Sequence, residues 1–166
     1  VITYLEWLSK KRPNSKGILQ EYLFGEVVIT SVWWNGEEPL LWWLLFEDKK
    51  YRAKGVGINT GCEISLVVPS TSPPDWLPAE KWISFLRDNK LVGGEYDINM
   101  MLTKNGAYFL EFGPRFGWDM DVTYLPLLIE RAYFEGLGNA LLEMARESTG
   151  TLLLIDGVAL SVRLSV

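Results

Sequence analysis

Alternating apolar and polar positions, interrupted twice by Asn-Gly, dominate the pattern of this chain. They predict one hairpin from Glu26–Trp34 and Leu40–Glu47 around Asn35-Gly36. A second hairpin is predicted within Val92–Gly117, where Lys104-Asn105-Gly106 separates two apolar runs. Asn and Gly both tolerate the positive φ angles of a tight turn, so this dipeptide between apolar runs is a strong hairpin signal. We therefore expect antiparallel strand pairs.

Helical spacing of apolar residues marks three further segments. Val1–Lys11 has this spacing and ends before a proline, and Ala79–Asp88 is entered through Pro78, a residue suited to a helix start. Tyr124–Arg146 has the same spacing over a longer stretch. Hairpins with flanking helices indicate an α+β fold with an antiparallel sheet.

Three weaker patterns complete the chain. Gly17–Leu23 is expected to be a short strand and Asp48–Gly61 a polar loop. Gly157–Val166 alternates like a strand, but the sequence suggests no partner for it.

The first hairpin carries two pairs of adjacent tryptophans, Trp33-Trp34 and Trp42-Trp43. Neighbours on a strand point to opposite faces of the sheet. We expect one indole of each pair to pack in the core and the other to cover an edge or an interface, rather than to stack on a ligand. Such a surface would also allow a homodimer through this hairpin.

Composition and charge narrow the class of protein. Apolar residues make up 48% of the chain and eight are tryptophan, which excludes a disordered protein. The net charge of −5 without a basic run argues against nucleic acid as a partner. The chain has no histidine, so imidazole catalysis and His-ligated zinc are excluded. A single cysteine, Cys62, and a longest apolar run of only Leu40–Phe46 predict a cytoplasmic protein without a membrane partner.

The string LEFGPRFG at the end of the second hairpin brings Glu111 and Arg115 close together. Pairing around the Asn-Gly turn places Asn99 on the partner strand near Glu111. A carboxylate, an amide oxygen and a guanidinium suit a magnesium–polyphosphate complex, because hard cations prefer oxygen and Arg binds phosphate bidentately. The alternative is that these are ordinary solvated strand residues.

Together these segments resemble a known family. ILQEYLFGE, a hairpin, INTG and LTKNGAYFLEFGPRFG followed by an apolar helix resemble the C-terminal half of an ATP-grasp domain, in particular that of phosphoribosylamine–glycine ligase. The final GVALSVRLSV resembles the start of that family's last domain. The resemblance implies a partial ATP-grasp domain over residues 1–150 and the start of a following segment over residues 151–166.

The resemblance also implies an activity: an ATP- and Mg²⁺-dependent ligase of purine biosynthesis that forms carbon–nitrogen bonds through an acyl phosphate. Its partners would be a nucleotide and small-molecule substrates. Glu21, Tyr22 and Leu23 match the linker whose backbone reads the adenine edge. Val27 stands where the family has a ribose-binding Glu, and the adjacent Glu26 is the nearest carboxylate, although on a strand it would face the other way.

The remaining site residues follow from the same resemblance. Glu111 and Asn99 match the metal-binding positions, and Arg115 matches the catalytic Arg that faces the transferred phosphoryl group. Asn59-Thr60-Gly61 resembles the loop that closes over the amine and ribosyl-phosphate substrates. We expect Glu111 and Asn99 to face one cavity beside Glu21–Leu23, with Arg115 at its rim.

The chain departs from the family pattern in ways that leave two functions open. Gly113 stands where the family has a metal-binding Asn, and the family's phosphate-gripping Lys belongs to a strand that would precede Val1. Weak or absent Mg²⁺-ATP binding is therefore expected for the isolated chain, and its start at Val favours a fragment. The chain is either the ATP-binding part of a ligase or a non-catalytic relative used as an interaction module.

Overall fold

The computed structural model describes residues 2–52, 56–117, 123, 124, 127, 138, 141, 142, 145, 146 and 157–163. The elements in chain order are α1 (Ile2–Lys11), β1 (Glu26–Trp34), β2 (Pro39–Arg52), β3 (Val56–Ser70), α2 (Ala79–Asp88), β4 (Gly94–Thr103), β5 (Gly106–Gly113) and β6 (Ala159–Val162). The predicted helices at the start of the chain and after Pro78 are confirmed. The predicted helix Tyr124–Arg146 lies mostly outside the described residues.

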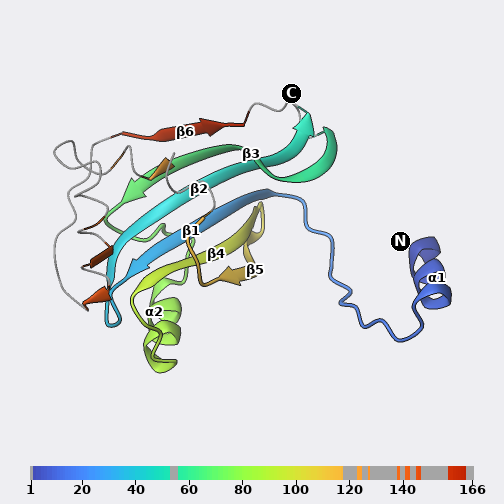
Figure 1. The fold of residues 1–166 in the computed structure, drawn as a ribbon, viewed down its shortest axis with the longest axis horizontal. Coiled ribbons are helices and arrows are strands. Elements are labelled where there is room, and N and C mark those ends of the chain that lie inside the picture. Colours follow the sequence, from blue (N-terminus) through green and yellow to red (C-terminus); the bar gives the residue numbers. More distant parts are fainter. Residues whose placement is uncertain are drawn as a thin grey trace.

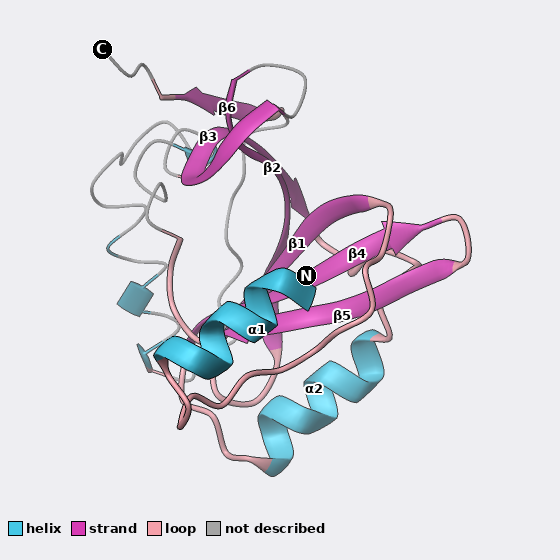
Figure 2. Ribbon diagram, turned by 90° about the vertical axis from the view of Figure 1, so that its right-hand side faces the viewer, coloured by secondary structure: helices cyan, strands magenta, loops and turns pink. Residues whose placement is uncertain are grey.

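The strands form one antiparallel sheet in the order β5–β4–β1–β2–β3–β6 (Figure 1). Helix α2 lies against one face of this sheet (Figure 2). The α+β class with an antiparallel sheet is therefore confirmed. No helix of the described residues is long and apolar enough to cross a membrane.

Both predicted hairpins are present, and the first turn shows how Asn35 and Gly36 stabilise it. The Asn35 side-chain oxygen accepts hydrogen bonds from the backbone N–H groups of Glu37 (2.9 Å) and Glu38 (2.8 Å). Gly36 has a φ of 106°, a left-handed conformation that favours glycine. The second turn ends at Gly106 with a φ of 134°.

Hydrophobic clusters cover both faces of the sheet. Trp33 and Trp43 belong to one cluster, and Trp34 and Trp42 belong to the other, into which α2 inserts Leu86. All four indoles are at most 2% exposed. The expectation that one indole of each pair covers an edge or interface is wrong, because each face has its own core.

Two segments differ from their predicted structure. Gly17–Leu23 forms no strand, and Ile18 and Leu19 are 90% and 81% exposed, because no strand of the described chain pairs with this linker. The segment predicted as the loop Asp48–Gly61 instead extends β2 and β3, with backbone pairing of Lys50 with Asn59.

The last strand finds its partner at the far edge of the sheet. Strand β6 pairs antiparallel with β3, from Ile64 opposite Val162 to Val67 opposite Ala159. This contact joins segments nearly a hundred positions apart, which local sequence patterns do not reveal.

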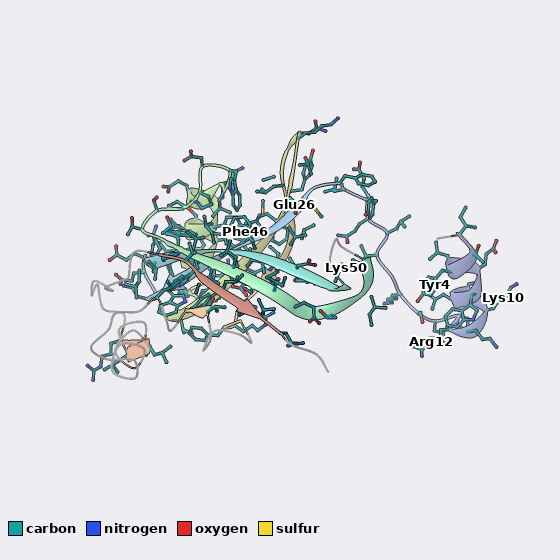
Figure 3. The ribbon with its side chains drawn as sticks, turned by 90° about the horizontal axis from the view of Figure 1, so that it is seen from above. Tyr4, Lys10, Arg12, Glu26, Phe46 and Lys50 are labelled. Carbon is teal, nitrogen blue, oxygen red and sulfur yellow. The ribbon has the colours of Figure 1, made fainter. Side chains whose placement is uncertain are left out.

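Helix α1 stands apart from the sheet at the end of an extended linker (Figure 1). It has no buried residue. Figure 3 shows Tyr4, Lys10 and Arg12 around this helix, well away from Glu26 and Phe46 on the sheet.

Candidate functional site

A row of polar side chains lies on one face of β4, in the middle of the sheet. Glu95, Asp97 and Asn99 alternate along the strand and so share a face. They are 2%, 5% and 7% exposed. Their β1 partners include Trp33 and Ser31, so the row lies on the face that carries the Trp33 cluster. Buried carboxylates are rare unless they are paired or serve a function.

The middle of this row opens into a pocket of about 90 Å³, which we call the acidic pocket. It is lined by Ile29, Leu45, Glu47, Lys49, Gly61, Asp97, Asn99, Glu111, Arg115 and Gly117. The β4–β5 register places Asn99 directly opposite Glu111, as the position of the Asn-Gly turn predicts. The structure thus brings Asn99, Glu111 and Arg115 to one pocket.

Opposite charges meet in the acidic pocket. Lys49 Nζ lies 2.9 Å from Glu47 Oε2, and Arg115 donates a 3.0 Å hydrogen bond to Asp97 Oδ2. The Arg115 side chain is 68% exposed while that of Asp97 is 7% exposed. Arg115 therefore has donors free to contact a ligand while one nitrogen holds the buried carboxylate.

Burial raises the pKa of Asp97 from 3.8 to about 6. The nearby Ser31 hydroxyl and the positive charge of Arg115 oppose this rise, while the negative charge of Glu47 adds to it. The balance leaves Asp97 ionised at neutral pH but more costly to ionise than a surface carboxylate.

The pKa of Glu95 is raised further than that of Asp97. Burial, followed by the nearby charge of Asp97, raises its pKa from 4.5 to about 8. Its Oε1 atom accepts hydrogen bonds from Ser31 Oγ and, at 2.9 Å, from Tyr124 OH. The Tyr124 ring is stacked on Trp43 with centroids 4.6 Å apart, which fixes the hydroxyl beside the acid. Glu95 therefore carries a proton at neutral pH.

The donor set of the acidic pocket fits a hard divalent cation. Glu111 and Asn99 provide a carboxylate and an amide oxygen, and the buried Asp97 Oδ1 atom has no hydrogen-bond partner among the residues that the structure describes. Within the part of the chain that the structure describes, no group of three His, Cys, Asp or Glu side chains could hold a metal by itself. Mg²⁺ suits such a mixed site because it takes oxygen ligands and keeps several waters.

The predicted adenine linker lines a different pocket, of about 400 Å³, which we call the linker pocket. Its lining residues are Gln20, Glu21, Tyr22, Leu23, Met101, Tyr108, Phe109 and Leu110. Asn99 and Glu111 face one pocket, as expected, and the linker lines a separate pocket. Met101 lies two residues after Asn99 on the same face of β4, about 7 Å further along a strand. The two pockets are neighbours on one face of the sheet.

The other expected ligand-binding residues lie outside these pockets, with one exception. Glu26 is exposed at the start of β1 and lines neither pocket. Asn59, Thr60 and Gly61 form part of strand β3, so the expectation of a closing loop is wrong. Thr60 Oγ1 donates to the Lys49 carbonyl at 2.9 Å, and Gly61 lines the acidic pocket.

Three acidic residues of this region were missed by the sequence reasoning: Glu47, Glu95 and Asp97. The last two had a visible signal, since EYDIN places ionisable side chains on alternate positions of an otherwise apolar strand. Such a pattern on a central strand indicates a buried polar row. Glu47 had no comparable signal, because the strand that carries it was expected to end there.

No protein-family profile matches the sequence, and no curated protein matches it. Solved structures do match its fold. Phosphoribosylamine–glycine ligase from Thermotoga maritima superposes with a TM-score of 0.61 and 25% identity, over 86% of this chain and 36% of that chain. This chain thus has an ATP-grasp fold like that of phosphoribosylamine–glycine ligase, and it spans about a third of that enzyme's length.

Two further matches have lower scores. Phosphoribosylglycinamide synthetase from Anaerococcus prevotii has a TM-score of 0.47 and 15% identity, over 77% of this chain and 30% of that chain. The ATPase subunit of phosphoribosylaminoimidazole carboxylase from Aquifex aeolicus has a TM-score of 0.48 and 20% identity, over 81% of this chain and 38% of that chain.

Proposed function

We propose that this chain is the ATP-binding part of an ATP-dependent carbon–nitrogen ligase that acts through an acyl phosphate, similar to phosphoribosylamine–glycine ligase of purine biosynthesis. The observation that carries the proposal is the convergence of Asn99, Glu111 and Arg115 in the acidic pocket of an ATP-grasp fold. That pocket adjoins the linker pocket on the same sheet face, as a site for an extended nucleotide requires.

In this proposal the acidic pocket holds the polyphosphate end of ATP. Glu111 and Asn99 would hold Mg²⁺, which when bound neutralises phosphate charge. Arg115 would contact the phosphoryl oxygens through its exposed guanidinium, where a fixed positive charge stabilises the charge that develops during transfer. Lys49, on the rim formed by β2, would add a second cation.

The linker pocket would hold the adenosine end. Tyr22, Tyr108 and Phe109 give it aromatic surface on which a base can pack. Glu21 and Leu23 would offer backbone groups to the adenine edge. Glu26 pairs with Leu102 and so faces the opposite side of the sheet from Met101, which gives its predicted ribose contact no support from this geometry.

The alternative of an interaction module loses its main support in this structure. It relied on exposed tryptophans of the first hairpin, and all four of these indoles are buried. A homodimer through that hairpin would have to use other side chains, and it stays a prediction.

The test is calorimetric titration of the chain with ATP, with Mg²⁺ and with a chelator. We expect binding that depends on Mg²⁺ and is millimolar, because two backbone hydrogen bonds of about 1 kcal/mol each offset little of the cost of association. Glu111→Gln should remove the Mg²⁺ dependence. Glu6→Gln, an exposed change on α1, is the matched control.

Identical binding by the original chain and the Glu111→Gln variant, with and without Mg²⁺, would overturn the proposal. In that case Glu111 would have only a structural role in the β4–β5 hairpin.

A further inference from the structure

We propose that the Asp97 carboxylate is a third oxygen ligand of the divalent cation, beside Glu111 and Asn99. In this chain Asp97 supplies from β4 the oxygen that a side chain at position 113 of β5 could otherwise supply. The inference rests on the proposed function, because it concerns the same cation site.

The first observation is an unpartnered oxygen. Asp97 is 5% exposed, and its Oδ2 atom is held by Arg115 at 3.0 Å. Its Oδ1 atom is buried and has no hydrogen-bond partner among the described residues. A buried carboxylate oxygen without a partner is costly, so such an atom in a pocket indicates a ligand that binds there. Asp97 lines the acidic pocket together with Asn99 and Glu111.

The second observation is the glycine directly opposite. Gly113 pairs with Asp97 across the β4–β5 ladder. A Cβ atom added at Gly113 would lie 3.5 Å from Asp97 Cβ and 3.7 Å from Asp97 Oδ2, at ordinary contact distances. Side chains at these two positions therefore reach the same part of the pocket. Glycine leaves that space to the Asp97 carboxylate.

The third observation is the charge of the acidic pocket. Three carboxylates (Glu47, Asp97 and Glu111) meet two cations (Lys49 and Arg115), which leaves an excess of negative charge if no cation binds. Glu47 is paired with Lys49, and Arg115 contacts only one of the two Asp97 oxygens. Asp97 Oδ1 and Glu111 are thus the oxygens left for a divalent cation.

A simpler role for Asp97 would be to position Arg115 through their ion pair. The two roles differ in what they require of the metal. A positioning role affects nucleotide binding through Arg115 and weakens the binding of a free cation by no more than about a hundredfold, as for other residues outside the ligand shell. A ligand role weakens the affinity for the cation even without nucleotide.

The experiment is a titration of the full chain with Mn²⁺ at neutral pH without nucleotide. Bound and free Mn²⁺ are separated by electron paramagnetic resonance, and Mg²⁺ is then added as competitor. Asp97→Asn keeps the side-chain volume and removes a buried charge, so the fold should persist. We expect it to weaken Mn²⁺ binding by more than about a hundredfold, which exceeds the roughly 10- to 100-fold loss caused by residues outside the ligand shell.

The matched control is Glu95→Gln. Glu95 lies on the same face of the same strand and is as deeply buried, but it does not line the acidic pocket. Its replacement should leave Mn²⁺ affinity unchanged. A second pair of variants tests the exchange of positions: Asp97→Ala with Gly113→Asn should bind Mn²⁺ more tightly than Asp97→Ala alone, because it returns an oxygen from the opposite strand.

The outcomes separate the two proposals. A loss of less than about a hundredfold in Asp97→Asn together with a larger loss in Glu111→Gln would overturn the ligand role and leave the proposed function intact. Unchanged Mn²⁺ affinity in both variants would overturn the cation site itself, and the proposed function with it. Equal affinity of Asp97→Ala with and without Gly113→Asn would overturn the proposed exchange between strands.

Discussion

Replacing the buried Glu95 by Gln should make this protein more stable at high pH and leave its stability at low pH nearly unchanged. Glu95 is 2% exposed, and its pKa is raised from 4.5 to about 8, mainly by burial. Gln keeps an oxygen that can accept the hydrogen bonds from Ser31 and Tyr124, and it cannot ionise.

The direction of this pH effect follows from the protonation of Glu95 in the folded and unfolded states. Below pH 4.5 the carboxyl group is protonated whether the chain is folded or unfolded, so its titration does not lower the free energy of unfolding. Between 4.5 and about 8 only the unfolded state loses the proton, and the free energy of unfolding falls as the pH rises. Above about pH 8 Glu95 is ionised in both states, and the full loss in the free energy of unfolding remains.

The loss of stability expected on ionising Glu95 is large for a single domain. A pKa raised from 4.5 to about 8 corresponds to roughly 5 kcal/mol, at about 1.4 kcal/mol for each pKa unit. Natural domains are stable by about 5–15 kcal/mol, so ionising Glu95 removes a substantial part of the total. Asp97, whose pKa is raised to about 6, adds a smaller loss in the same direction in both proteins.

The assay is urea unfolding of the original chain and of Glu95→Gln at about pH 5 and about pH 9. The variant should gain several kcal/mol relative to the original chain at the higher pH and little at the lower one. Glu6→Gln on the exposed helix α1 serves as control. Parallel pH dependence of the original chain and Glu95→Gln would refute the reasoning, because it would mean that Glu95 ionises equally easily in both states.

Two further predictions concern packing. Trp33→Ala should lower the free energy of unfolding by about 3–5 kcal/mol, since Trp33 is fully buried, whereas Trp7→Ala at a half-exposed position of α1 should change it by less than about 0.5 kcal/mol. Similar losses in chemical unfolding would contradict the assignment of Trp33 to the core. Gly25→Ala would place a Cβ atom 2.1 Å from the Leu102 carbonyl oxygen, so a loss of about 1–3 kcal/mol is expected in the same assay. Wild-type stability of Gly25→Ala would show that the linker can leave this contact without cost.

Much of the candidate site could be predicted from local sequence patterns. The turn at Asn105-Gly106 defined the register of β4 and β5, and with it the contact between Asn99 and Glu111. Arg115 could be placed near this contact because it lies two residues after the end of β5. The deep burial of Asp97 beside Arg115 did not follow, because a sequence does not show how completely each face of a strand is covered.

The sequence by itself determined helix α2, both hairpins and the alternation of faces along their strands, because a proline at a helix start, Asn-Gly turns and periodicity act over a few neighbouring residues. Only the tertiary structure decided that β6 pairs with β3, that both faces of the Trp33–Trp34 strand are buried, and that the linker pocket is separate from the acidic pocket. It also decided the high pKa of Glu95. Burial and desolvation depend on which distant segments cover a side chain, and that information lies in the packed fold rather than in any local stretch of sequence.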